Sequence, residues 1–107
     1  MITLEEFQKV ELTIGEIKEV SEHPNADKLY VLKVDLGGDV RQLVAGVRLA
    51  YPNKEELIGK KIVVVKNLQP AVIRGIESQG MMLAASGEGA LAIIHPGKDI
   101  PLGSVVR

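Results

Sequence analysis

The side chains of this chain best suited to bind a ligand gather between Lys66 and Ala84. A cation and two hydrogen-bonding side chains stand there, at Arg74, Ser78 and Gln79. Guanidinium, hydroxyl and amide groups bind phosphates and polar edges. Three residues with special backbone preferences interrupt the same stretch: Pro70, Gly75 and Gly80. They predict a semi-rigid loop that is not a plain hairpin, and an ordinary solvated surface loop is the alternative interpretation.

Catalytic and metal chemistry find little support in the residues. The chain contains no cysteine, which excludes disulfides and thiolate metal sites. His23 and Asp27 belong to a turn cluster, and one histidine with one carboxylate supplies too few ligands for zinc, since His95 is far along the chain. The segment Gly87-Glu88-Gly89 lacks the lysine and hydroxyl of a P-loop. We therefore expect no catalytic residue, no metal and no cofactor, and a binding protein rather than an enzyme.

Charge is distributed unevenly along the 107 residues. The net charge is −1, yet residues 1–37 carry −4 and residues 38–75 carry +4. A basic segment inside a neutral chain can form one positive face, and the local potential decides where phosphates bind. The alternative is that these cations are scattered around the molecule.

The hydrophobic pattern predicts short strands and two short helices. Thr3 and Glu6 have the spacing of a capping box, which opens a helix through Gln8. Residues 10–14 alternate as a half-buried strand, and Gly15 then marks a slip of the apolar phase. That slip predicts a bulge or a strongly coiled long strand. Further strands are expected at 29–36, 40–45, 62–65, around Met82, at 90–94 and at 104–107, with a helix at 54–58.

This order of elements predicts an all-β fold with short helices, the five-stranded Greek-key barrel of the oligonucleotide/oligosaccharide-binding (OB) fold. Residues 1–107 then form a single domain, with a barrel at about 9–85 and extension strands at about 86–107. Such barrels bind single strands by stacking bases on aromatic side chains. This chain has only Phe7, Tyr30 and Tyr51, and they are not clustered. A nucleic-acid ligand is therefore expected to be folded and recognised through its backbone and shape.

Ordered motifs span nearly the whole chain: Phe7-x-Lys-Val-Glu-Leu-x-Ile-Gly-x-Ile17, His23-Pro-Asn-Ala-Asp-Lys-Leu29, Lys33-Val-Asp-x-Gly37, Leu43-Val-Ala-Gly46, Glu56-Leu-x-Gly-Lys-Lys61, Asn67-Leu-x-Pro70 and Gly75-Ile-Glu-Ser-Gln-Gly-Met81. In these motifs the chain resembles the tRNA-binding domain family. Its members include the C-terminal domain of many methionyl-tRNA synthetases and stand-alone structure-specific tRNA-binding proteins. The resemblance implies non-catalytic, structure-specific tRNA binding. Read as starting at Met1, the chain is most similar to the stand-alone or detached synthetase-domain branch that assists aminoacylation, with a synthetase as a further partner.

The resemblance also implies where the tRNA binds. Its Ser-x-Gly-Met element, which is associated with tRNA contact, falls on Ser78, Gly80 and Met81. Three more residues of the same stretch join this expectation: Asn67, Arg74 and Gln79. Barrel geometry and charge, rather than a motif, add three residues of the preceding strands: Lys33, Arg41 and Gln42.

A homodimer is expected as well, because relatives of this branch dimerise through segments beyond the barrel. The apolar run Ala90–Ile94 would leave an exposed strand edge, which a second copy can cover. The expected interface residues are Leu91, Ile93, Ile94 and Val105. The alternative is that this segment folds back over its own barrel.

A protein-binding interpretation stays open. Chaperone-like members of the same fold bind extended peptides, and Met81 with Met82 would form an adaptable apolar surface. The N-terminus lacks the basic and apolar regions of a secretory signal, and no apolar run reaches the ~20 residues of a membrane span. We therefore expect a cytoplasmic protein without a membrane partner.

Overall fold

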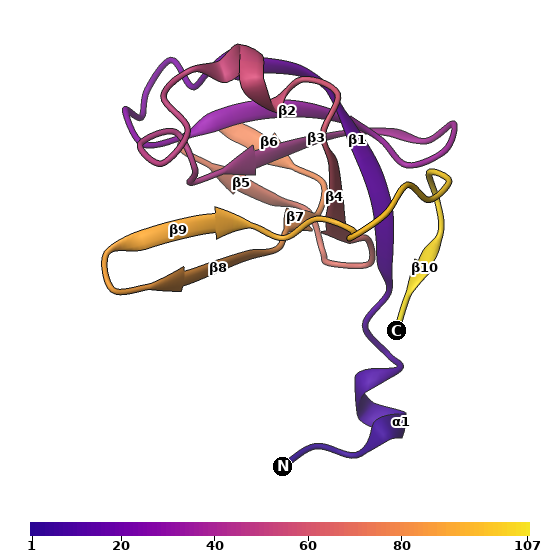
Figure 1. The fold of residues 1–107 in the computed structure, drawn as a ribbon. Helices are drawn as coiled ribbons and strands as arrows, with labels where there is room; N and C mark the ends of the chain where they lie inside the picture. Colours follow the sequence, from indigo (N-terminus) through magenta and orange to yellow (C-terminus); the bar gives the residue numbers. More distant parts are fainter.

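A computed structural model describes residues 1–107 and confirms a mostly β fold with an OB-like barrel. The elements in chain order are α1 (Leu4–Phe7), β1 (Leu12–Glu22), β2 (Tyr30–Asp35), β3 (Val40–Ala45), the 3-10 helix η1 (Lys54–Leu57), β4 (Lys61–Val65), β5 (Ala71–Ile73), β6 (Ile76–Ser78), β7 (Met81–Met82), β8 (Ala84–Gly87), β9 (Ala90–Ile93) and β10 (Val105–Val106). The main sheet has the order β3-β2-β1-β4-β7, and β10 adds to β1 (Figure 1).

The long strand β1 organises the barrel by pairing in two directions. Its first half is antiparallel to β4, and its second half is antiparallel to β2. Gly15 is required by close packing, because a Cβ at this position would lie 2.6 Å from a methyl group of Leu36. Of the two alternatives predicted at Gly15, a bulge or a long coiled strand, the long strand is present at the glycine. The register shifts between Ile17 and Glu19, two residues beyond the glycine.

The core fills the barrel with aliphatic side chains from the inward faces of the strands. In β2 the burial alternates residue by residue, which places Tyr30, Leu32 and Val34 inside. Each such side chain contributes about 1.5–3 kcal/mol by leaving water. The hydroxyl of Tyr30 donates a hydrogen bond to the carbonyl of Tyr51 at 2.7 Å, so its polar end is satisfied.

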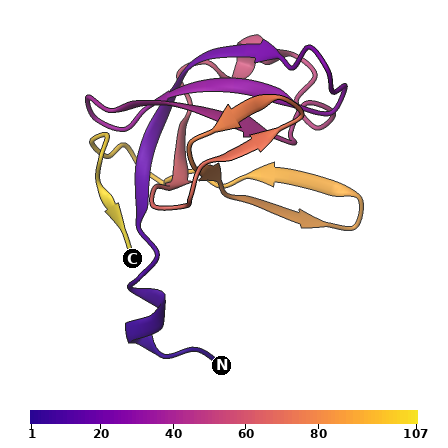
Figure 2. The same cartoon turned by 180° about the vertical axis from the view of Figure 1, so that it is seen from behind.

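Two short hairpins lie beside the main sheet, β5–β6 and β8–β9. The connection from β4 to β7 is therefore not a plain hairpin, as predicted, but it contains the β5–β6 hairpin, which was not predicted. Its two-residue turn is made by Arg74 and Gly75, both with positive φ (54° and 92°), which suits the twist of a tight hairpin. Pro70 lies just before β5, so its missing N–H interrupts no ladder bond. The β8–β9 hairpin projects from the barrel in both views (Figures 1 and 2).

Both chain ends emerge on the same side of the barrel, where α1 and β10 extend away from it (Figures 1 and 2). The capping box of Thr3 and Glu6 is present, and α1 buries none of its residues. Ile93 was expected on a free apolar edge, and this is wrong. It is 7% exposed and belongs to the core cluster, because the chain turns back after β8 and lays the end of β9 against the barrel. No helix of the chain is long and apolar enough to cross a membrane.

Candidate functional site

Six of the nine residues predicted for the site lie between residues 66 and 81, a stretch that we call the rim loop, and the other three lie on β2 and β3. The rim-loop segment from Glu77 to Gln79 bonds Gln42 and Val44 of β3 and closes the barrel there. Ser78 is 4% exposed, and its hydroxyl accepts a hydrogen bond from the backbone N–H of Val44 at 3.0 Å. The same hydroxyl donates to the carbonyl of Gly80 at 2.9 Å. The structure therefore places Ser78 in the barrel closure, with both functions of its hydroxyl used inside the chain.

Gly80 is buried as well, and its conformation explains the residue type. Its φ is 136°, and a Cβ would lie 2.9 Å from the carbonyl oxygen of Val65. Only glycine passes β4 at this distance with this φ. The motif residues Ser78 and Gly80 thus shape the rim loop and lie beneath its surface.

Gln79 completes the closure next to Ser78. Its backbone N–H donates to the carbonyl of Gln42 at 2.8 Å, and its side-chain oxygen accepts from the backbone N–H of Gln42 at 2.9 Å. The side chain of Gln42 in turn donates to the carbonyl of Glu77 and accepts from Lys33 Nζ, both at 2.8 Å. Lys33, Gln42 and Gln79 therefore form one connected network, as three of the predicted residues brought together.

Arg41 joins β3 to both ends of the rim loop. One guanidinium nitrogen donates to the carbonyl oxygens of Lys66 and Gln79, and the group also forms an ion pair with Asp39 at 3.0 Å. A guanidinium held by three acceptors is positioned rather than mobile. The remaining N–H group and the charge are what Arg41 can still offer a ligand.

Asn67 is used at the other end of the loop. Its side-chain oxygen accepts from the backbone N–H of Glu11 at 2.8 Å, and its amide nitrogen donates to the carbonyl of Lys9 at 2.7 Å. Lys66 supports the same junction, because its backbone N–H donates to the carbonyl of Glu11. Asn67 therefore fixes the segment that precedes β1, which is a different role from the closure that Ser78 makes.

The tip of the β5–β6 hairpin is held by the turn cluster predicted to be structural. His23 is buried, and its Nδ1 accepts from the backbone N–H of Asn25 at 3.0 Å. The ring therefore carries its proton on Nε2, which donates to the carbonyl of Ile73 at 3.0 Å. Arg74 is exposed at the turn and donates to the carbonyl of Asn25. This arrangement presents the Arg74 charge on a fixed hairpin.

The rim loop also exposes apolar side chains. Met81 is 54% exposed and Val72 is 71% exposed, with Leu68 also open to solvent. Met81 borders a hollow of about 220 Å³ lined mainly by apolar residues of β3, β7 and β9. Sequence reasoning found Met81 but missed Val72 and Leu68. Both residues are close in sequence to Pro70, and proline is not found inside a central buried strand. This proximity is the signal from which their exposure could have been predicted.

Ion pairs reduce the free charge of the basic middle segment. Four of its seven cations are paired within the chain: Arg41, Arg48, Lys54 and Lys61. Lys54, with Arg48, lowers the pKa of Glu22. The hydrogen bond from Lys61 lowers the pKa of Asp99. The unpaired Lys66 and the exposed Arg74 are the cations that the rim loop itself can offer to an anion.

Aromatic stacking is not available at this surface. Tyr30 lies in the core, the hydroxyl of Tyr51 accepts from the backbone N–H of Ile93, and Phe7 is on α1. No group of three or more histidine and carboxylate side chains could hold a metal ion. The candidate site is therefore a rim on an OB-like barrel that carries cations, polar groups and exposed apolar side chains.

The family itself follows from comparison with known proteins. Residues 12–105 match the family model described as "Putative tRNA binding domain". The chain belongs to this tRNA-binding domain family, as the motifs predicted.

Relatives and solved structures place the chain further. It is 53% identical over 106 residues to a methionine–tRNA ligase of Pyrococcus furiosus and 47% identical over 107 residues to that of Nanoarchaeum equitans. These matches span 99–100% of this chain but only 14% of the length of each ligase. A MetRS-related protein from Pyrococcus horikoshii superposes with a TM-score of 0.93 at 35% identity, covering 100% of this chain and 98% of that one. The CsaA chaperone protein of Picrophilus torridus superposes with a TM-score of 0.91 at 31% identity over the full length of both chains.

Proposed function

We propose that this chain binds folded tRNA without catalysing a reaction, and that it assists a methionine–tRNA ligase in aminoacylation in the cytoplasm. The observation that carries the proposal is the match of residues 12–105 to the tRNA-binding family, together with about 50% identity to a segment of methionine–tRNA ligases. The absence of aromatic side chains from the rim loop supports a folded ligand over an extended single strand.

In this proposal Arg74 and Met81 of the rim loop contact the RNA, together with the solvent-facing part of Arg41 on β3. Lys33 and Gln42 act indirectly, because Gln42 bonds Gln79 and Lys33 bonds Gln42. Ser78, Gly80 and Asn67 are assigned to positioning the rim loop. The side-chain polar groups of Ser78 and Asn67 are already bonded inside the chain, and Gly80 is enclosed by neighbouring residues.

A competition gel shift tests tRNA binding directly. Total tRNA and an unstructured RNA of the same length compete for the chain, and folded tRNA should compete far better. The logarithm of the affinity should fall linearly with the logarithm of the salt concentration, with a slope of about −3 to −7 for four to eight phosphate contacts. Equal competition by the two RNAs would rule the proposal out.

Assistance to a ligase needs its own measurement. A methionine–tRNA ligase lacking its related segment is assayed with and without this chain fused to its C-terminus. Because the domain supplies binding rather than chemistry, the KM for tRNA should fall while kcat stays unchanged. An unchanged KM would show that tRNA binding by this chain does not serve that enzyme.

We also propose that two copies assemble through α1 and β10. A hollow of about 400 Å³ lies between them, lined by Phe7, Val10 and Val105 among others. Val105 is 69% exposed on a two-residue strand whose outer edge is free. A four-residue helix that buries nothing gains no stability from packing, so a second copy seated here would supply its missing partner surface. Ile93 is left out of this interface because it is buried in the chain's own core, whereas Leu91, which is only partly buried, and Ile94, which is 39% exposed, stay candidates.

Binding of extended peptides is the second candidate. It is favoured by the likeness to CsaA chaperones and by the exposed Met81 beside an apolar hollow. An affinity for peptides with a salt slope near zero, and no preference for folded tRNA, would support this function instead.

A further inference from the structure

A hollow lined by charged side chains lies away from the rim loop, at the opposite end of β4. It has a volume of about 290 Å³ and six lining residues, three of which are lysines: Lys60, Lys61, His95, Pro96, Lys98 and Asp99. We call it the lysine hollow. Three lysine side chains line this hollow, and ammonium groups suit an anion.

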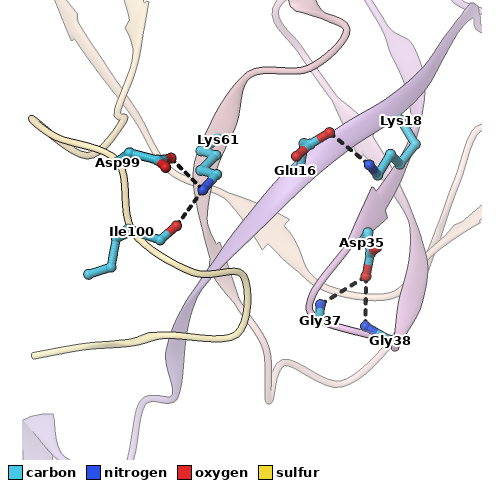
Figure 3. Close-up of polar contacts among 8 residues, drawn as sticks. All are labelled: Glu16, Lys18, Asp35, Gly37, Gly38, Lys61, Asp99 and Ile100. Carbon is cyan, nitrogen blue, oxygen red and sulfur yellow. Dashed lines mark hydrogen bonds and ion pairs between the residues drawn. The ribbon is translucent and has the colours of Figure 1, made fainter.

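The frame of the lysine hollow is fixed by one internal contact. Lys61 donates to the Asp99 carboxylate at 2.6 Å and to the carbonyl of Ile100, which ties the C-terminal segment to the start of β4 (Figure 3). Because Asp99 is already bonded to Lys61, it opposes an incoming anion less than a free carboxylate would. The backbone of Lys60 is fixed too, since its N–H and carbonyl bond Leu57 and Ile17.

Two of the three cations of the lysine hollow are free of internal contacts. Lys60 and Lys98 are exposed, form no ion pair and donate no side-chain hydrogen bond. By contrast, the cations predicted from the sequence all bond acceptors within the chain: Lys33, Arg41 and Arg74. An unpaired ammonium can meet a phosphate without first breaking an internal contact.

We propose that the lysine hollow binds a phosphate of the RNA backbone, with Lys60 and Lys98 as the direct contacts and Lys61 as the residue that positions them. This rests on the proposed function. Lys61 begins β4 and Lys66 follows its end. At about 3.3 Å per residue, the two sites lie roughly 17 Å apart along β4. A ligand that engages both must span that length, which a folded RNA does and free phosphate does not.

The test compares two double variants of the 107-residue chain. K60A/K98A removes the direct contacts, and K9A/K28A removes two other lysines that line no part of the lysine hollow. K60A/K98A should bind total tRNA more weakly, with a salt slope shallower by about one unit for each phosphate that the variant no longer neutralises. K9A/K28A should keep the wild-type slope. Equal effects of the two variants, or no effect of K60A/K98A, would overturn the proposal. Unchanged melting temperatures confirm that both variants are folded.

A second arm separates this inference from the proposed function. Inorganic phosphate is titrated into the isotopically labelled chain at constant ionic strength, with chloride as the reference anion. If wild type binds no tRNA, the proposed function fails, and the RNA assignment of the lysine hollow fails with it. Saturable amide shifts confined to residues 60–61 and 95–99, and abolished in K60A/K98A, would then support an anion site for free phosphate. The absence of such shifts would overturn the anion site altogether.

Discussion

The side-chain oxygen of Gln79 takes the place of a strand carbonyl opposite Gln42. It accepts the Gln42 N–H at 2.9 Å, while the Gln79 N–H donates to the Gln42 carbonyl at 2.8 Å. One residue thus satisfies both backbone groups of its neighbour, as a pair of ladder bonds would. The edge of β3 is thereby closed without a continuous strand, and the shape of the rim loop depends on a few side chains.

Replacing Ser78 should weaken that closure. Ser78→Ala leaves the buried N–H of Val44 without its hydroxyl acceptor, so the free energy of unfolding should fall by about 1–3 kcal/mol. Urea denaturation measures this change, with the exposed Ser86→Ala as the control, which should change stability by less than about 0.5 kcal/mol. Equal stability of the two variants would contradict a structural role for the Ser78 hydroxyl.

Gly80 should tolerate substitution far less than Gly87. Gly80→Ala forces a Cβ to within 2.9 Å of the Val65 carbonyl at a φ of 136°. We expect the free energy of unfolding to fall by about 1–3 kcal/mol or more. Gly87→Ala enters open space and should be nearly neutral. Thermal unfolding of both variants checks the difference, and a stable Gly80→Ala would show that β4 can move aside.

Replacing Arg41 and replacing Arg74 should affect stability and tRNA binding differently. Arg41→Ala removes a group that bonds the carbonyls of Lys66 and Gln79, so both stability and tRNA affinity should decrease. Arg74→Ala removes an exposed charge, and it should make the salt slope shallower by about one unit with little change in unfolding. Calorimetry alongside binding at several salt concentrations separates these effects. A stable Arg41→Ala with reduced affinity would assign Arg41 to direct contact alone.

A charge on β10 should split the proposed dimer without unfolding the barrel. Val105→Asp places a carboxylate on the exposed outer strand, and sedimentation equilibrium should then give a monomer. Val40→Asp, at a similarly exposed position of β3, is the matched control and should stay dimeric. Ile93→Asp should instead unfold the chain, because it buries an unpaired charge in the core. A wild-type monomer that binds tRNA at full strength would exclude the dimer as the functional unit.

Acid should destabilise the turn between β2 and β3. The N–H groups of Gly38 and Gly37 bond the Asp35 carboxylate and lower its pKa from the ordinary 3.8 (Figure 3). A lowered folded-state pKa means that the carboxylate stabilises the fold at neutral pH and loses this contribution as pH falls below about 4. Asp35→Asn should therefore be less stable than wild type at about pH 7, and the difference should shrink towards about pH 2. A difference independent of pH would contradict the charge-based origin.

The barrel could be predicted because its signals are local. Alternation in 29–36 and 40–45, the capping box at Thr3 and the glycine turn between the strands each follow from neighbouring residues. The β5–β6 hairpin was missed because Arg74 adopts a positive φ, which its residue type does not announce. Ile93 was misplaced because its burial depends on where β9 crosses the barrel, a contact made by residues far apart in the sequence.

The candidate site shows the same division. The rim loop could be located from the sequence as a segment, but exposed and enclosed side chains within it could not be told apart. Ser78 and Asn67 are polar residues in a loop, which usually suggests contact with a ligand. Their partners, Val44 and Glu11, are 34 and 56 residues away in the chain, and only the folded structure brings them together.

The β8–β9 hairpin gives the molecule a place where chain can be added. It projects from the barrel, and side chains built at Gly87 or Gly89 would meet no atom within 4 Å (Figure 1). Residues inserted between these two glycines should therefore leave the core, the rim loop and the lysine hollow as they are. A fluorescent label or an affinity tag carried at this tip would report on the intact protein while both chain ends stay free.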